Sequence, residues 1–132
     1  AGATVGGIVG RFLCGNSFVP CVATNTVLGW KQGICAEVLF TFTIVTVVLH
    51  MATTRANENN SMAGLSIGLT VFACAVAAGP ISGAVFNPAI GIGLWLAKAL
   101  TSPTSLLQVA RHMALYTIAP IVGALLGTAA FK

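Results

Sequence analysis

Three long runs of apolar residues dominate the pattern along this chain. They cover residues 34–51, 62–78 and 106–131, and only isolated polar positions interrupt them. A membrane-spanning helix needs about 20 largely apolar residues, and each run comes close to that length or exceeds it. The pattern therefore predicts three membrane-spanning helices. The polar stretches beside these runs are typical of connectors: residues 14–33, 52–61 and 98–105.

A shorter apolar segment, residues 1–13, stands at the start of the sequence. It has glycines at a spacing of four, which leaves one face of a helix bare for close packing: Gly2, Gly6 and Gly10. We predict that this segment is the end of a further membrane helix. We also expect the protein's sequence to continue upstream of it.

The segment after the second run, residues 79–97, is almost free of polar residues but is not expected to form one regular helix. Gly79, Pro80 and Gly83 favour a break directly after residue 78. Pro88 to Ala97 then reads as a helix about 15 Å long, half a bilayer core. Irregular backbone survives at membrane depth only where it is buried in protein or lines an aqueous cavity. We predict a re-entrant loop and half-helix here.

Composition favours a membrane protein and disfavours most other classes. The chain is 57% hydrophobic and only 6% charged, too few ionisable groups for the surface of a soluble domain. Its six basic residues stand singly, as in loops, and form no run that would suit nucleic acid. Two acidic residues and two histidines leave little for a catalytic or metal site, so we expect neither enzyme activity nor a cofactor. His50 and His112 are expected at the membrane interface.

Four cysteines bear on the redox state. Cys35 and Cys74 lie in apolar runs and are expected to act as packing residues. Cys14 and Cys21 flank a polar connector, where either a disulfide or two free thiols would fit.

Asn87, Pro88 and Ala89 have the chemistry of a helix start. Asparagine is a favoured N-cap, and proline at the first helical position loses only an amide that would be unpaired anyway. If the helix starts near the bilayer midplane, the positive end of its dipole disfavours cations, and the Asn87 amide can donate to a passing solute. Carbonyl groups of the preceding backbone can accept, at Gly83, Val85 and Phe86. The same tripeptide also suits an ordinary interfacial helix.

Residues 79–89, with the sequence GPISGAVFNPA, closely resemble the pore loop of the aquaporin, or major intrinsic protein, family. Ala36-Glu37 followed by Thr41-Phe42 is similar to the motif that opens the first helix of each half in that family. Residues 116–127 resemble its sixth helix and residues 1–13 the end of its third. The resemblance covers nearly the whole chain and implies an all-α, multi-pass membrane channel, usually a homotetramer.

The resemblance further implies two inverted halves whose half-helices meet at the midplane to form a pore. This sequence contains one half-helix, so a lone copy is not expected to close a pore of the usual kind. A second Asn-Pro-Ala loop upstream would favour a channel for water and small neutral solutes. Without it, the alternatives are a channel-derived structural subunit of a larger membrane assembly or a pore built from two chains.

Carried over residue by residue, the family's selectivity constriction falls on Ala75, Ala84 and Ile90. The family usually places an arginine after the Asn-Pro-Ala motif, where it narrows the pore and repels cations, but this chain has Ile90. All three positions are apolar, which implies a wider constriction whose barrier to ions is the helix dipole and desolvation. We therefore expect glycerol or urea to pass as well as water.

Glu37 is an ionisable residue within a predicted span, and such residues are functional candidates. It could serve as a relay or a ligand. The resemblance implies instead a buried acceptor that braces the backbone of the pore loop, and this is the role we expect.

The sequence leaves the membrane and the orientation of the chain open. The resemblance places four cations on the outer side, Arg11, Lys31, Lys98 and Arg111, whereas the positive-inside rule favours the reverse. Asn59 begins a glycosylation sequon in a connector that the resemblance places inside. A glycan found on Asn59 would therefore contradict the orientation that the resemblance implies.

Overall fold

The computed structural model describes residues 1–14, 27–54 and 61–131 of the 132-residue chain. Over these residues the protein is helical and has no strand, which confirms the predicted all-α fold. The helices are α1 (Gly2–Cys14), α2 (Val27–Thr53), α3 (Ala63–Ser82), α4 (Pro88–Thr101) and α5 (Leu106–Ala130). Three of them, α2, α3 and α5, are long and apolar enough to cross a membrane.

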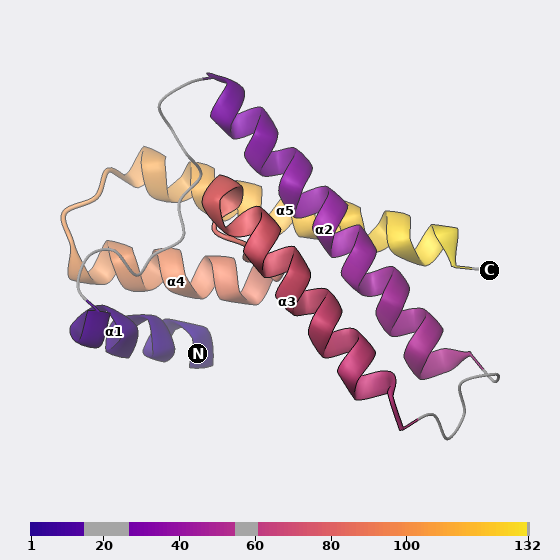
Figure 1. Ribbon diagram of the computed structural model, residues 1–132. Coiled ribbons are helices and arrows are strands. Elements are labelled where there is room, and N and C mark those ends of the chain that lie inside the picture. Colours follow the sequence, from indigo (N-terminus) through magenta and orange to yellow (C-terminus); the bar gives the residue numbers. More distant parts are fainter. Residues whose placement is uncertain (15–26, 55–60, 132) are drawn as a thin grey trace.

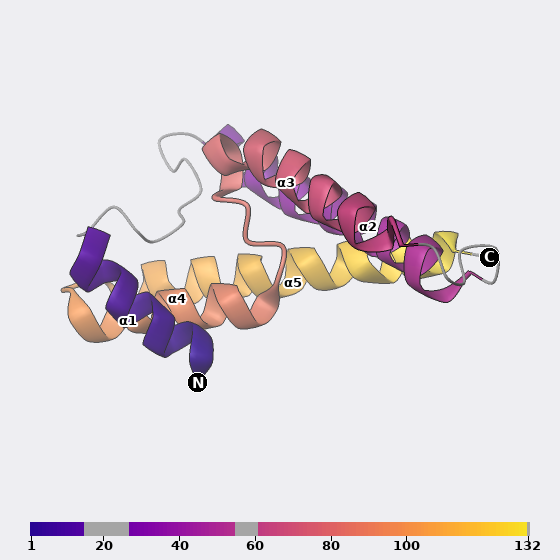
Figure 2. The same cartoon turned by 60° about the horizontal axis from the view of Figure 1, so that its bottom comes forward.

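The helices pack in two groups that meet along α5 (Figure 1). α2 and α3 run antiparallel beside each other, and α5 packs against α2. α4 lies between α1 and the first part of α5 (Figure 2). At 14 residues, α4 is about 21 Å long and too short to cross a bilayer core.

The apolar environment explains why β-branched sequence forms helix here. The α2 segment Ile44–Val48 consists of isoleucine, valine and threonine, which favour strands in water. In lipid every backbone amide and carbonyl needs a partner within the segment, so a lone span becomes a helix. Two threonine hydroxyls of this helix are satisfied in the same way, since Thr43 donates to the Leu39 carbonyl and Thr46 to the Phe42 carbonyl.

Close approach at glycines sets how the helices cross. A Cβ added to Gly123 of α5 would lie 2.4 Å from the Val38 carbonyl oxygen of α2, and one added to Gly93 of α4 would lie 2.4 Å from Ala3 Cβ of α1. In residues 1–13, the glycine spacing predicted close packing on the face that carries Gly2 and Gly6. Both have open space beside them, and it is Gly7 that meets α4, at Ala97.

The predicted break at Gly79-Pro80 is wrong, because α3 continues to Ser82. A proline disturbs only the turn before it, and Pro80 stands in the last turn of α3. The helix ends instead at Gly83, whose φ of 86° is left-handed and whose amide donates to the Gly79 carbonyl, closing the last turn.

Two helices extend into segments predicted as connectors. α4 continues past Ala97 to Thr101, because Lys98 favours a helix C-terminus and the extended Ser102 before Pro103 ends the helix. α2 begins at Val27, so Trp30 is helical and half-buried instead of lying in a loop.

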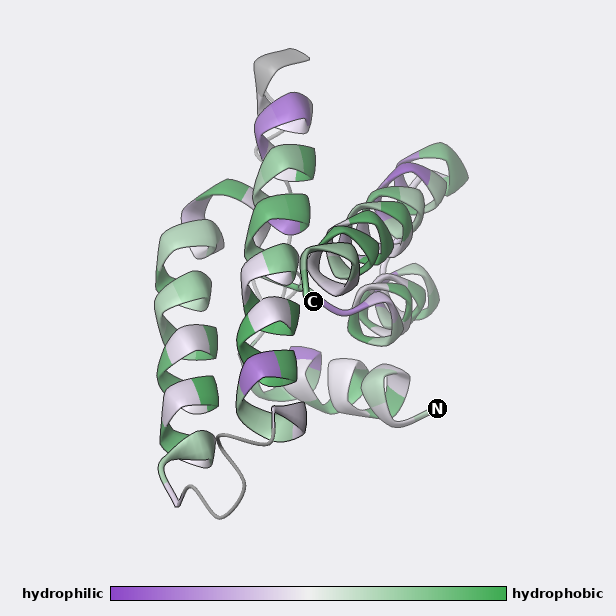
Figure 3. Cartoon of the chain, turned by 90° about the vertical axis from the view of Figure 1, so that its right-hand side faces the viewer, coloured by the Kyte–Doolittle hydropathy of each residue, from purple (hydrophilic) through white to green (hydrophobic). Residues whose placement is uncertain are grey.

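Most apolar side chains of the spans face outward. Only 11% of the most apolar stretch of α3 is buried within the chain, and Leu69, Phe72 and Val76 are exposed. Hydrophobic residues make up most of the length of these helices (Figure 3). This surface needs lipid or further protein to cover it.

The described cysteines are free thiols. Cys74 is buried, as expected, but Cys35 is exposed on α2 and is not a packing residue within the chain. Cys14 is also a free, exposed thiol, and Cys21 and Asn59 lie outside the described residues.

Candidate functional site

The backbone between α3 and α4, residues 83–87, has an unusual conformation. Gly83, Ala84 and Phe86 all have positive φ, at 86°, 53° and 50°. Only glycine adopts this region freely, and a residue with a Cβ is strained there by roughly 1–2 kcal/mol. Such strain persists only where the surrounding structure fixes the backbone.

Glu37 provides that fixation from α2. Its side chain is fully buried, and its carboxylate accepts hydrogen bonds from the Val85 amide at 3.1 Å and the Phe86 amide at 2.8 Å. The Ser82 hydroxyl donates to it at 2.6 Å. Hydrogen bonds to a charged group are stronger than neutral ones, so these three offset much of the desolvation of the carboxylate. The geometry makes Glu37 an anchor for the loop.

A second support comes from α5. The Tyr116 hydroxyl donates to the Ser82 carbonyl, and the Ser82 hydroxyl accepts a bond from the Ala84 amide at 3.2 Å. Both Tyr116 and Ser82 are fully buried. The end of α3 is therefore tied to α2 and α5 at the point where the irregular backbone begins.

The carbonyl groups of residues 83–86 have no hydrogen-bond partner among the described residues. They lie outside both helices, and the amides of Ile90 and Gly91 bond the next carbonyl along, that of Asn87. Unpaired carbonyls at membrane depth require water or a polar solute.

Asn87 begins α4 as its N-cap. Its backbone is extended, and its side-chain Oδ1 accepts from the Ala89 amide at 2.9 Å, with Pro88 at the first helical position. Because Oδ1 is engaged, the free capacity of this exposed side chain is the donor pair on Nδ2. The first turn of α4 contains no acidic residue, so the helix itself carries no charge that opposes the positive end of its dipole.

The three residues predicted to form the constriction stand on different elements. Ala75 stands on α3 and Ala84 in the loop, both half-buried, and Ile90 stands in the first turn of α4 with 41% of its surface exposed. Among the loop residues, Val85 is buried, and the Phe86 ring lies 6.0 Å from the Phe40 ring.

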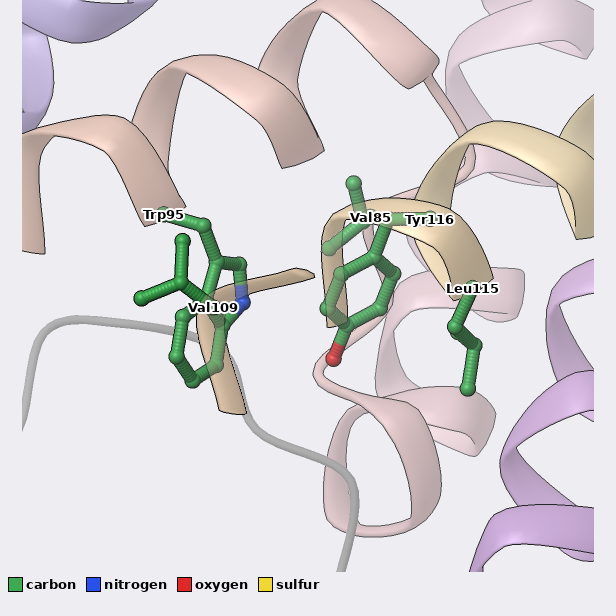
Figure 4. Packing of buried hydrophobic residues seen from close by; sticks show 5 residues of the cluster. All are labelled: Val85, Trp95, Val109, Leu115 and Tyr116. Carbon is green, nitrogen blue, oxygen red and sulfur yellow. The ribbon is translucent and has the colours of Figure 1, made fainter. Parts of the chain in front are cut away.

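A small apolar cluster holds α4 against α5. Val85, Trp95, Val109, Leu115 and Tyr116 are buried together (Figure 4). Gly91 permits the contact, because an added Cβ would lie 2.4 Å from the Tyr116 Cβ. The half-helix thus has a fixed position relative to α5.

His112 stands near the start of α5, at a span end as predicted, but its side chain is fully buried within the chain. Its ring stacks on that of Trp95, with ring centroids 4.0 Å apart. The Trp30 ring is tilted against the His112 ring, with centroids 4.7 Å apart. Trp30 of α2 and Trp95 of α4 cover the His112 ring, whereas the first residues of α5 are exposed. His50 is exposed at the end of α2, and its Nδ1 pairs with the Thr46 carbonyl.

Sequence reasoning missed Ser82, Tyr116 and Trp95 as supports of the site. Tyr116 is the chain's only tyrosine and stands in an apolar span, which is a signal, since a buried tyrosine hydroxyl usually needs a partner. Nothing local in the sequence distinguishes Ser82 or Trp95 from other helix residues.

The chain matches the model of the major intrinsic protein family over residues 1–131. It is 31% identical to aquaporin NIP1-4 of Oryza sativa subsp. japonica, an alignment that covers 100% of this chain and 45% of that protein. It is 32% identical to the probable aquaporin AqpM of Archaeoglobus fulgidus, over 94% of this chain and 44% of that protein.

The chain is also 34% identical to aquaporin TIP2-1 of Arabidopsis thaliana, over 70% of this chain and 37% of that protein. It therefore spans less than half the length of these relatives. No solved structure matches it significantly. A family match over nearly the whole chain, together with three apolar spans, shows that this membrane protein belongs to the major intrinsic protein family.

Proposed function

We propose that this chain forms one half of a passive channel for water and small neutral solutes. The observation that supports this most directly is the hydrogen bonding of the Asn87 side chain. Its oxygen is held by the Ala89 amide, so its amide donors remain available at the start of a half-helix. The unpaired carbonyls of residues 83–86 supply acceptors beside it. A line of donors and acceptors in apolar surroundings suits a neutral polar solute.

Ion exclusion in this proposal depends on α4 instead of an arginine. The positive end of the α4 dipole, without an acidic residue in the first turn, disfavours cations. Ala75, Ala84 and Ile90 add no charge and little bulk, so we infer a constriction wide enough for glycerol or urea. Other protein segments would complete the pore wall, and the complete protein would assemble as a homotetramer or within a larger membrane assembly.

The alternative is a structural subunit without a conducting pore. It is favoured by the apolar surface that the chain leaves uncovered, which would suit docking to other membrane proteins as well as lipid.

Stopped-flow measurements on vesicles containing the intact protein separate these proposals. We expect water and glycerol fluxes above those of protein-free vesicles, and we expect Ile90→Arg to reduce glycerol flux more than water flux. Ile92→Arg is a matched control for an added charge two positions along α4, at a similarly exposed isoleucine. Water flux without glycerol flux would contradict the wide constriction. Neither flux would favour the structural subunit.

A further inference from the structure

A cleft between α2 and α5 joins a polar mouth to an apolar trunk. The trunk has a volume of about 560 Å³ and is lined on α2 by Ile34 and Val38 and on α5 by Ala114, Ile118 and Val122. The mouth, about 300 Å³, lies at the start of α5 beside Ser105, Gln108 and His112. Trp30 and Arg111 line both parts. We call this continuous surface the α2/α5 cleft.

The mouth is positively charged and has no acidic counterpart. Arg111 is exposed there, and the N-terminal turn of α5 contributes the positive end of a helix dipole with no acidic residue to neutralise it. Glu37 is the only carboxylate side chain among the described residues, and both its oxygens accept bonds from the loop. Arg111 therefore has no carboxylate partner in the described part of the chain.

His112 adds unused hydrogen-bonding capacity beside the mouth. Its Nδ1 pairs with the Gln108 carbonyl at 2.9 Å, and its buried Nε2 has no partner among the described residues. Such an atom in a fully buried side chain indicates a place where water or a ligand group completes the structure.

Four basic residues that stand singly along the sequence lie at one end of the fold, the side on which the resemblance places them. Arg11 donates to the Ser102 hydroxyl, just after α4. The Lys98 ammonium lies 4.5 Å from the centre of the Trp95 ring, which stacks on His112. Lys31 follows Trp30 in α2, and Arg111 precedes His112 in α5. This end of the helix bundle therefore presents cations where the spans leave the membrane.

The length of the trunk fits one leaflet of a bilayer. Arg111 to Val122 is a rise of about 16 Å along α5, close to half of a hydrocarbon core of roughly 30 Å. A free phosphate would use only the mouth, whereas a phospholipid would use both parts. We propose that the α2/α5 cleft binds an anionic phospholipid, with its phosphate at Arg111 and an acyl chain along the trunk. None of the predicted pore residues lines the cleft, so this site does not depend on conduction.

Native mass spectrometry of the full-length protein in detergent tests this, with phosphatidylglycerol and phosphatidylcholine of equal chain length as probes. We expect phosphatidylglycerol to be retained preferentially and Arg111→Gln to weaken its retention about tenfold, as for the loss of a charge-assisted hydrogen bond. Lys31→Gln is the matched control, because it removes an exposed charge at the same end without touching the cleft. We expect it to change retention less than twofold.

Ala114→Trp tests the trunk separately, because its ring would fill the space between α2 and α5. We expect it to reduce lipid retention while thermal unfolding stays cooperative. Several outcomes would overturn the proposal: equal retention of the two lipids, equal losses in Arg111→Gln and Lys31→Gln, or no bound lipid because another segment fills the cleft. Thermal stabilisation by inorganic phosphate equal to that by phosphatidylglycerol would assign the mouth to a free anion instead.

Discussion

Two buried polar regions beside α4 are in opposite states. At the N-terminal end of α4, Glu37 accepts three hydrogen bonds, and the strained loop depends on them. Against the middle of α4, His112 stacks on Trp95 and both are fully buried, but His112 Nε2 and Trp95 Nε1 have no partner among the described residues. The first region is fixed by its polar contacts, and the second is fixed by apolar packing.

The comparison teaches that burial alone does not say what a polar residue does. A buried group whose atoms are all satisfied is costly to remove, because its partners lose their bonds with it. A buried group with a spare atom loses little when an apolar ring of similar shape replaces it. Four substitutions measure this difference, and their expected losses of stability decrease in the order given.

Glu37→Leu should have the largest effect. It would leave the amides of Val85 and Phe86 and the Ser82 hydroxyl without their acceptor. We expect a loss of about 3–5 kcal/mol in the free energy of unfolding, measured in detergent. Glu37→Gln keeps one acceptor oxygen and should lose less. A loss below about 1 kcal/mol for Glu37→Leu would refute the bracing role.

Gly91→Ala should come next, because its Cβ would lie 2.4 Å from the Tyr116 Cβ and push α4 away from α5. Overpacking of this kind costs about 1–3 kcal/mol. Gly68→Ala, with open space beside it, is the matched control and should be neutral or stabilising by up to about 1 kcal/mol. Thermal unfolding of both variants tests this. Equal shifts in their melting temperatures would contradict the close packing of Gly91 against Tyr116.

Tyr116→Phe removes only the hydroxyl that donates to the Ser82 carbonyl. We expect a loss of about 0.5–1.5 kcal/mol in unfolding free energy. The ring and its apolar contacts remain, so α4 should keep its position. In vesicle flux measurements, the temperature dependence of solute flux through Tyr116→Phe should therefore differ little from that of the unchanged protein. A loss as large as that of Glu37→Leu would mean that the hydroxyl, and not the carboxylate, fixes the loop.

His112→Phe should have the smallest effect, within about 1 kcal/mol, since it keeps a ring on Trp95 and removes an unpartnered nitrogen. Differential scanning fluorimetry in detergent is sufficient to compare it with Glu37→Gln. If His112→Phe destabilised the protein as strongly as Glu37→Leu, the contrast between the Glu37 contacts and the His112–Trp95 stack would not hold.

Local sequence patterns were sufficient to predict where the long helices lie and where α4 begins. Apolar run length predicted the spans, and Asn87-Pro88 predicted where α4 begins, because both depend on neighbouring residues alone. The wrong predictions were also local. Pro80 was expected to break α3 and Lys98 to begin a connector, yet each stands in the last turn of a helix, where proline and lysine are tolerated.

Which distant residues meet depends on the packing of the helices. Glu37 contacts backbone almost fifty positions away, His112 becomes buried, and four cations that stand apart in sequence share one end. The resemblance to a family suggested the first and the last of these, but nothing in the sequence predicted the burial of His112. These contacts depend on how the helices cross. The crossings are set by close approaches such as Gly123 against Val38 and Gly91 against Tyr116, and each approach requires two surfaces that are far apart in sequence.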